Sequence, residues 1–196
     1  MRKASEPDVP QIAGVLARAF HDDPVFRWAY PDDDERLERL PGIFAVFTEA
    51  IAPHDEIYVA DGLAGAALWA PPGRDAVSEE HAGTFEGRLA DAAGPDAGRM
   101  FEVAQLVEER HPHGSFYYLQ FLGVDPASQG RGLGSVLLAD ALRRCDADGA
   151  RAYLDATSPH NKRLYERHGF RAGPSYAPAG GPPLWPMWRE PQSSRS

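Results

Sequence analysis

The sequence predicts an α/β fold whose sheet has mixed strand directions. The chain has 196 residues, which suits one domain with a sizeable core. Its 43% hydrophobic and 25% charged residues match the average composition of globular proteins and exclude disorder throughout. The patterns follow the order helices, hairpin, helices, then strand, helix, strand, helix and two strands, and this alternation indicates the α/β class.

Two apolar stripes at helical spacing open the chain. Residues 9–20 form the first, and this helix must end before Pro24, because proline disfavours helical geometry in the residue that precedes it. The second stripe covers residues 37–51, and Pro41 marks either the start of that helix or a kink. The acidic run 32–35 is expected to cap a helix and to match its dipole.

A hairpin and two covering helices come next. Residues 56–60 and 63–70 flank Asp61-Gly62, a dipeptide that accepts the positive φ angles of a tight turn. Residues 78–110 have a helical pattern that is interrupted at Gly94-Pro95. Their polar, alanine-rich character predicts two helices that cover a face rather than form a deep core.

The second half alternates strands with helices. Strand-like runs cover 116–124, 150–156, 170–176 and 184–189. A glycine-rich turn and an apolar-faced helix separate the first two runs. A short helix over 159–168 follows the second run and ends at Gly169. Residues 191–196 are expected to be a disordered tail.

Charge and cysteine content exclude several classes of protein. Cys145 is the single cysteine, so no intramolecular disulfide or cysteine-based zinc cluster can form, which fits a reducing, cytoplasmic location. The chain has no apolar run of the roughly 20 residues that a membrane span needs, and its first residues lack the apolar core of a signal peptide. A net charge of −9 repels nucleic acid and anionic lipid and attracts cations. We therefore expect neither nucleic acid nor membrane as a partner.

The strongest chemical signal is the loop 129–135, Gln-Gly-Arg-Gly-Leu-Gly-Ser, between an expected strand and an expected helix. Its glycines let the backbone approach a ligand closely, and its successive N–H groups lie at the positive end of the helix, so the loop suits a diphosphate. It lacks the Gly-Lys-Ser/Thr of a P-loop and the glycine spacing of dinucleotide-binding folds. A tight turn without a ligand is the alternative.

This loop stands in a wider set of motifs. They are Leu122-Gly123-Val124-Asp125-Pro126, then Gln129, Gly132 and Gly134 in the pattern Gln/Arg-x-x-Gly-x-Gly/Ala, then Asn161 with Tyr165-Glu166-Arg167-His168-Gly169-Phe170. Together they resemble the GNAT superfamily of acyl-CoA-dependent N-acyltransferases, and most closely its small-molecule subgroup that is similar to puromycin N-acetyltransferase. The likeness is specific over residues 116–171 and looser over the first 115 residues.

The resemblance implies a GNAT-like acyl-CoA N-acyltransferase fold, with a mostly antiparallel sheet splayed around acetyl-CoA. One domain would span residues 1–190, with acceptor-side helices and a hairpin over 1–115 and the acetyl-CoA-binding core over 116–171. The backbone of Leu122, Gly123 and Val124 would pair with the pantetheine arm. The pyrophosphate would be held by Gln129, Gly130, Arg131, Gly132, Leu133, Gly134 and Ser135. Asn161 would bind the cofactor, and Tyr165 would lie beside its sulfur.

The chemistry of a thioester accounts for the tyrosine. Attack by an amine expels a thiolate whose thiol has a pKa of about 8.5 if it resembles cysteine, against about 10 for tyrosine. Tyr165 can therefore donate a proton to the sulfur without being ionised at rest, as a general acid. The alternative is that Tyr165 is a core aromatic on an amphipathic helix.

The sequence does not identify the base that deprotonates the amine. Some relatives place a glutamate on the central strand where this chain has Tyr118. The candidates in its place are Glu108, Glu109, His111, His113, Asp22 and Asp23. The candidate wall residues of an acceptor pocket are Trp28, Tyr30, Phe44, Phe47, Trp69, Phe85, Met100 and Phe101. We expect most of them to belong to the core and two or three to face a ligand.

The function implied by the resemblance is N-acetylation. The enzyme would pass the acetyl group of acetyl-CoA directly to a primary amine of a small molecule, antibiotic-like or aminoacyl in character, without a metal. The alternatives are an acetyltransferase for protein N-termini or lysines and a non-catalytic acyl-CoA-binding sensor. We expect a monomer or a homodimer.

Overall fold

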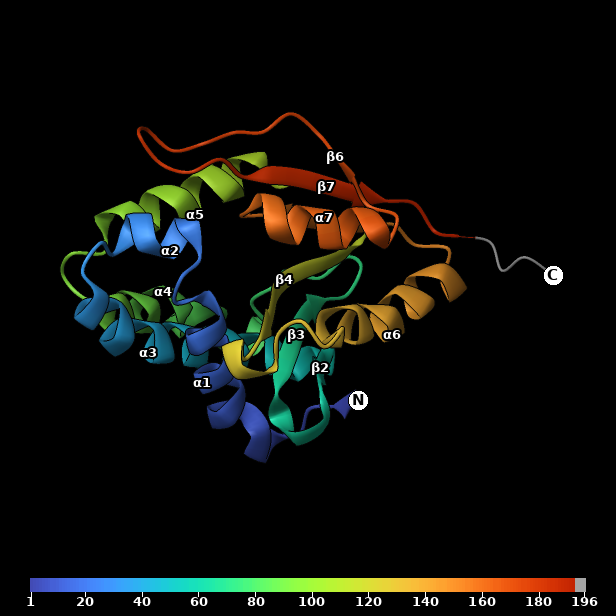
Figure 1. Cartoon of the computed structure of the whole chain (residues 1–196), viewed down its shortest axis with the longest axis horizontal. Coiled ribbons are helices and arrows are strands. Elements are labelled where there is room, and N and C mark those ends of the chain that lie inside the picture. Colours follow the sequence, from blue (N-terminus) through green and yellow to red (C-terminus); the bar gives the residue numbers. More distant parts are fainter. Residues whose placement is uncertain (193–196) are drawn as a thin grey trace.

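The computed structural model describes residues 1–192, in which helices flank a seven-stranded sheet (Figure 1). The strands are β1 (Arg2–Lys3), β2 (Ile57–Val59), β3 (Gly65–Ala70), β4 (Tyr117–Val124), β5 (Ala152–Ala156), β6 (Arg171–Ala172) and β7 (Trp185–Arg189). They lie in the order β1-β2-β3-β4-β5-β7-β6, and only β4 and β5 pair in parallel. The predicted α/β class and the mostly antiparallel mixed sheet are confirmed. Four residues of the expected tail, 193–196, lie outside the described part.

Seven α-helices occur within residues 1–192, together with short 3-10 turns at 6–8, 52–54, 61–63 and 126–128. The helices are α1 (Val9–Phe20), α2 (Pro24–Ala29), α3 (Asp33–Ile51), α4 (Glu79–Ala93), α5 (Gly98–Arg110), α6 (Leu133–Ala147) and α7 (Pro159–Arg167). None of them is long and apolar enough to cross a membrane.

The early helices differ from the sequence expectations in two respects. Pro41 does not start a helix, because it lies inside α3, whose N-cap is Asp32 with its carboxylate accepting from the Glu35 N–H at 2.9 Å. Burial of Leu40 and Phe44 on this helix offsets the hydrogen bond that proline cannot make. Helix α2 was not predicted, because its six residues are too few to show a helical period.

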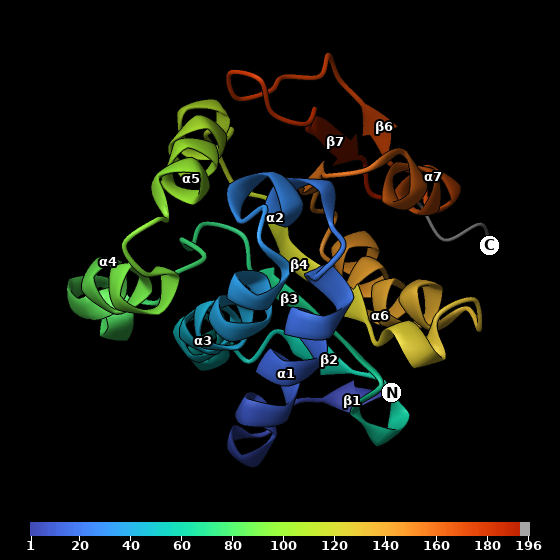
Figure 2. The ribbon, with the colours of Figure 1, turned by 60° about the vertical axis from the view of Figure 1, so that its left-hand side comes forward.

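The sheet has a separate core on each face. Helices α1 and α3 cover one face, where Leu16 and Phe44 belong to the same cluster as Leu68 of β3. Helices α6 and α7 cover the other face, where Leu137 belongs to the same cluster as Trp69. Adjacent residues of a strand point to opposite faces, which is why Leu68 and Trp69 lie in different cores. Helices α4 and α5 stand outside α3 and α2 (Figure 2).

Helix α1 crosses β4 at very short range. A Cβ atom at Gly123 would lie 2.9 Å from the Cβ of Ala19 and 2.9 Å from Cδ2 of Leu16. Real Cβ atoms do not approach so closely, so this position on β4 requires glycine. The glycine of the Leu122-Gly123-Val124 motif therefore has a packing role in addition to any ligand role.

The buried guanidinium of Arg36 fixes the connection between α1, α2 and α3. It donates to the backbone carbonyl of His21 at 3.0 Å and to that of Tyr30 at 2.7 Å. Further bonds reach the carbonyls of Pro31 and Asp32, and the Asp33 carboxylate pairs with the same group. This clasp holds α2 over the middle of the molecule.

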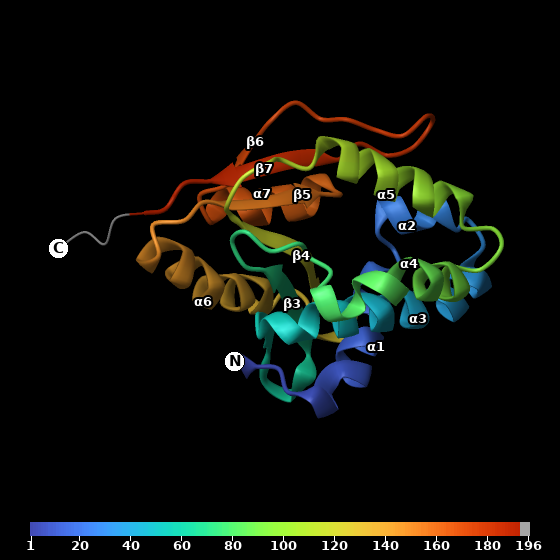
Figure 3. The same ribbon diagram turned by 180° about the vertical axis from the view of Figure 1, so that it is seen from behind.

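The last two strands are joined by a long excursion. The expected strand 170–176 is reduced to β6 and one isolated bridge between Tyr176 and Leu184. Between Tyr176 and Leu184 the chain runs along α5, where the Ala179 N–H donates to Glu102 at 3.1 Å (Figure 3). Proline and glycine in this segment interrupt the ladder, since proline has no N–H to donate.

Candidate active site

The sheet opens in its middle, between β4 and β5. The two strands pair only at Tyr117 with Ala152 and at Tyr118 with Tyr153. The register of β3 against β4 shifts just beyond this point, so that Gln120 bulges out of the ladder. Within residues 1–192 the remainder of β4 therefore has no neighbouring strand on the β5 side, and the expected splayed sheet is confirmed.

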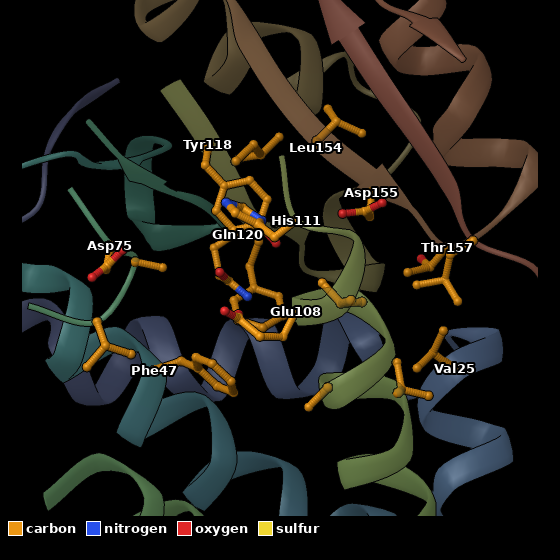
Figure 4. Close-up of a pocket in the computed structure, with 18 of the residues that line it drawn as sticks. Val25, Phe47, Asp75, Glu108, His111, Tyr118, Gln120, Leu154, Asp155 and Thr157 are labelled. Atoms are coloured by element: carbon orange, nitrogen blue, oxygen red, sulfur yellow. The ribbon is translucent and has the colours of Figure 1, made fainter. Parts of the chain in front are cut away.

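A cavity of about 720 Å³ lies at this opening (Figure 4). Leu119, Leu154 and Tyr165 line it and belong to the core beneath α6 and α7. Phe26 and Met100 line it too, and they belong to the core on the opposite face. The cavity thus reaches from one face of the sheet to the other through the space between the strands.

One part of the cavity wall is apolar. Of the eight aromatic and methionine residues expected to be core or pocket, Phe47, Phe85 and Met100 line the cavity. The rings of Phe47 and Phe85 lie 5.3 Å apart, centroid to centroid. The other five, Trp28, Tyr30, Phe44, Trp69 and Phe101, are not part of this lining. Tyr30, Phe44 and Trp69 are buried core residues, whereas Trp28 is half-buried and Phe101 is exposed. That Phe47, Phe85 and Met100 face a ligand stays a prediction.

The other part of the wall is polar. Glu108 comes from the last turn of α5, and His111 and His113 follow that helix. The ring of His111 packs edge-on against Tyr118, with centroids 4.6 Å apart. Gln120 lies beside them in Figure 4. This polar end therefore sits where β4 and β5 separate.

The candidate bases are divided by this geometry. Glu108, His111 and His113 line the cavity, whereas Glu109 and Asp22 are exposed and do not. Asp23 is not a lining residue either. Its carboxylate accepts from the Val25 N–H at 2.9 Å and from the hydroxyl of Thr157.

Tyr165 enters the cavity from α7 with only 6% of its surface exposed. Burial raises the pKa of its phenol above the ordinary value, and the nearby Asp23 carboxylate raises it further. The hydroxyl consequently keeps its proton at neutral and moderately alkaline pH. This state is the one that a proton donor needs.

Asn161 lies one helical turn before Tyr165 and also lines the cavity. Its side-chain oxygen accepts from the Ser158 N–H at 3.0 Å, and its amide nitrogen donates to Thr157 at 3.0 Å. The Ser158 hydroxyl in turn accepts from the Asn161 N–H. The side chain is therefore used to cap α7, and its binding to acetyl-CoA stays a prediction.

The glycine loop lies at the start of α6, beyond the end of β4. Gly132 is the N-cap residue with φ of 80°, a left-handed conformation that favours glycine. Asp23, Asp32 and Ser158 cap their helices with side-chain hydrogen bonds, but Gly132 has no side chain to do so. The first N–H groups of α6 are thus without a side-chain cap, as a site for an anion requires.

The loop is connected to the cavity through Gly134. A Cβ atom there would lie 3.2 Å from Leu164 of α7 and 3.7 Å from Leu122, which lines the cavity. Gln129 donates to the carbonyl of Val124 at 3.1 Å and ties the loop to β4. Leu122, Asn161 and Tyr165 are therefore brought together in the cavity, while residues 129–135 lie at its α6 side, outside the lining.

Asp155 is a lining residue that the sequence reasoning missed. Its Oδ1 accepts from Tyr176 at 2.8 Å and from Tyr153 at 3.0 Å. Burial raises the pKa of this carboxyl group. The available signal was a single charged residue inside the otherwise apolar stretch 152–156. Among residues 1–192, no group of three or more His, Cys, Asp or Glu side chains is arranged to hold a metal ion.

Known proteins share this architecture. The acetyltransferase (GNAT) family model matches residues 66–170, just over half of the chain. An uncharacterized N-acetyltransferase of Schizosaccharomyces pombe is 26% identical over an alignment 183 residues long, which covers 86% of this chain and 73% of that protein.

Two solved structures illustrate the likeness. A histone acetyltransferase HPA2 and related acetyltransferase from Corynebacterium glutamicum is 27% identical, with a TM-score of 0.69 over 100% of this chain and 97% of that one. Arylalkylamine N-acetyltransferase 2 from Aedes aegypti is 15% identical, with a TM-score of 0.68 over 97% and 98%, and shows the fold alone. With the family model matched across the splayed strands and the glycine loop, the chain belongs to the GNAT family of acetyltransferases and is an acyltransferase.

Proposed function

We propose that the protein transfers the acetyl group of acetyl-CoA directly to a primary amine of a small molecule. The observation that carries this proposal is the cavity between β4 and β5, which Tyr165 lines and which has an apolar wall and a polar end. Its volume of about 720 Å³ falls within the range of roughly 300–1,000 Å³ that small-ligand sites occupy.

The residues present fit acetyl-CoA, the acyl donor of GNAT acetyltransferases. The edge of β4 at Leu122, Gly123 and Val124 lies beyond the last pairing with β5 and offers backbone groups to the pantetheine arm. The first N–H groups of α6 offer donors to the pyrophosphate. Arg131 and Ser135 add side-chain donors in the same loop. Acetyl-CoA supplies an activated acyl group, so the enzyme needs no nucleophile of its own.

The transfer needs one proton donor and one proton acceptor. The amine nitrogen bonds to the carbonyl carbon as the carbon–sulfur bond breaks, and the sulfur leaves with the electron pair. Tyr165 gives its phenol proton to that sulfur and recovers a proton from the acetylated nitrogen, directly or through water. The first proton of the ammonium passes to a base, for which Glu108, His111 and His113 are the candidates that line the cavity.

The elements that cover the acceptor side of the cavity support a small acceptor over a protein chain. Residues of α2 and α5 line it, and so does Leu184 at the end of the long β6–β7 excursion, so helices and a loop cover the acceptor side. The likeness to the puromycin N-acetyltransferase subgroup points the same way. The histone acetyltransferase name of the Corynebacterium glutamicum structure keeps a protein N-terminus or lysine as the second candidate.

The test is thiol release from acetyl-CoA with aminoacyl nucleosides, aminoglycosides, polyamines, arylalkylamines, amino acids and short peptides. We expect turnover with a small amine and a loss of roughly 10²–10⁴-fold in kcat for Tyr165→Phe, with unchanged affinity for acetyl-CoA. Tyr117→Phe is the matched control, because that hydroxyl bonds to Asp148, and Tyr117 does not line the cavity. Turnover confined to peptides would establish the protein-modifying alternative. Binding of acetyl-CoA without turnover would favour the sensor.

A further inference from the structure

Asp155 occupies the position where the two central strands separate. The last hydrogen-bonded pair between them is Tyr118 with Tyr153, and Asp155 stands two residues further along β5. On β4 the corresponding position is Gln120, the bulged residue. Both side chains line the cavity (Figure 4). The carboxylate is therefore placed beside the gap in which the acyl group and the acceptor meet.

The side chain of Asp155 lies on the acceptor face of the sheet. Residues of a strand alternate in direction, so Asp155 points to the same face as Tyr153. Tyr153 packs with Phe116 and Tyr118, whereas Leu154 belongs to the core beneath α6 and α7. Asp155 and Tyr165 thus approach the cavity from opposite faces of the sheet, as an acceptor and an acyl donor would.

The carboxylate has unused capacity to accept hydrogen bonds. Two tyrosine hydroxyls bond to Oδ1, but Oδ2 is buried and has no hydrogen-bond partner within residues 1–192. An ionised carboxylate offers about four acceptor sites on its two oxygens. A buried carboxylate without a countercharge destabilises the unliganded protein. A cation bound beside the carboxylate removes this cost, so cation binding is favoured.

The charged groups around this position favour a cation. Glu108 lines the cavity from the end of α5, and the whole chain carries a net charge of −9. Arg74 also lines the cavity, but it is exposed and pairs with Glu79 at 3.2 Å. Asp75, His111 and His113 line the cavity as well, and His111 lowers the pKa of Asp155 against the larger effect of burial. A positively charged ligand is therefore attracted to the polar end of the cavity.

We propose that Asp155 is the residue that binds the ammonium group of the acceptor amine, and that the acceptor carries an apolar or aromatic group. The ammonium lies against the carboxylate at the polar end, and the apolar group lies along Phe47, Phe85 and Met100. This assignment rests on the proposed acetylation of a small amine and adds the residue that selects its charge. Tyr153 and Tyr176 hold the carboxylate through Oδ1, and the buried Oδ2 meets the ammonium when the carboxylate turns toward the cavity.

The experiment compares two probes of equal shape, 2-phenylethylamine and 2-phenylethanol, by calorimetric binding to the full-length protein. Wild-type protein should bind the amine more tightly than the alcohol. Asp155→Asn should weaken amine binding by roughly 10- to 100-fold, the factor that a buried charge-assisted hydrogen bond is typically worth, and leave alcohol binding within about twofold. Glu109→Gln is the matched control, since it removes the same charge from an exposed position outside the cavity lining.

Each outcome decides the assignment. Asparagine keeps an oxygen for the two tyrosine hydroxyls, and unchanged acetyl-CoA affinity of Asp155→Asn verifies that the variant is folded. Unchanged discrimination between amine and alcohol in Asp155→Asn overturns the proposal. A wild-type protein that prefers neither probe overturns it as well. Because binding is measured without turnover, these results are separate from a failure of acetylation, which appears as absent thiol release.

Discussion

The hydroxyl of Thr157 donates a hydrogen bond to Asp23 and so joins the end of β5 to the N-cap of α2, 134 residues earlier in the chain. Asn161 extends the network by donating to the same threonine. Three elements around the cavity are thereby connected, namely α2 on the acceptor face, β5 at the gap and α7, which carries Tyr165. The helix that carries Tyr165, the proposed general acid, is thus tied to the opposite wall of the cavity.

Loss of the Thr157 hydroxyl should destabilise the protein and do so in a pH-dependent way. Thr157→Val leaves an oxygen of Asp23 without this donor, which typically costs about 1–3 kcal/mol of unfolding free energy. Burial raises the folded-state pKa of Asp23, and the Thr157 hydrogen bond lowers it again. Removing that bond should therefore raise the folded-state pKa further.

The sign of the pH effect follows from this shift. A carboxyl group whose folded-state pKa is raised stabilises the protein fully below its unfolded pKa of about 3.9, and this contribution is lost as pH rises through the folded value. The destabilisation by Thr157→Val should therefore grow from pH 4 to neutrality. Urea unfolding at several pH values measures it, with Thr157→Ser as the control. An equal effect at every pH would contradict the role of Asp23.

Tyr165 should support catalysis over a wide alkaline range. Burial and the Asp23 charge hold its pKa above the ordinary tyrosine value of about 10, so the phenol remains a proton donor. We expect the kcat profile of wild-type enzyme to show no descending limb below pH 10. A limb near pH 8 that disappears in Tyr165→Phe would mean that the phenol ionises far more easily than its surroundings imply.

Substitution in the glycine loop should separate strain from loss of the acetyl-CoA site. Gly132→Glu places a negative charge where the pyrophosphate is expected and should abolish measurable acetyl-CoA binding by calorimetry. Gly149→Ala is the matched control, because its φ of 62° is also positive and a Cβ there also meets open space. Both variants should lose about 1–2 kcal/mol of stability from the left-handed backbone. Normal acetyl-CoA affinity in Gly132→Glu would refute the cradle.

Cys145 should be unreactive in the folded protein. It is fully buried, and burial raises the pKa of its thiol to about 12. Since the thiolate is the reactive species, a disulfide reagent at pH 8 should label it only as fast as the native structure opens. Labelling should become rapid in urea that unfolds the chain. Stoichiometric labelling within seconds in native buffer would show that the thiol is accessible.

The hydrogen bonds of the Arg36 clasp should contribute more to the stability of the fold than a surface ion pair does. Arg36→Met leaves several backbone carbonyls between α1 and α3 without donors, and we expect a loss of about 3 kcal/mol or more. Arg39→Met on the same helix should cost about 1 kcal/mol or less, because its exposed partner is Glu38. Chemical denaturation of both variants compares them. Equal losses would remove the clasp as an explanation.

Much of this architecture is readable in the sequence because local patterns determine it. Helix α6 and the loop before it follow from glycine spacing, and the β2–β3 hairpin follows from Asp61-Gly62. Tyr165 and Leu122 were assigned by resemblance and meet in one cavity. In each case the signal lies within a few residues of the feature that it predicts.

The features that were missed depend on residues far apart in the chain. Helix α2 is short and is held by Arg36 and Thr157 rather than by its own periodicity. Asp155 gains its importance from Tyr176 and from the separation of β4, neither of which a strand pattern reveals. The role of Arg36 likewise appears only once the helix ends surround it. Long-range packing supplies the information that local sequence lacks.

The short parallel ladder between β4 and β5 has a mechanical consequence. With pairing confined to Tyr117 and Tyr118 on one strand, the sheet consists of two half-sheets that share a narrow seam. A molecule that fills the gap contacts both half-sheets, so its binding raises the free energy needed to separate or unfold either of them. Occupancy of the gap should therefore slow amide hydrogen exchange in strands on both sides of the seam, including strands that the ligand never touches.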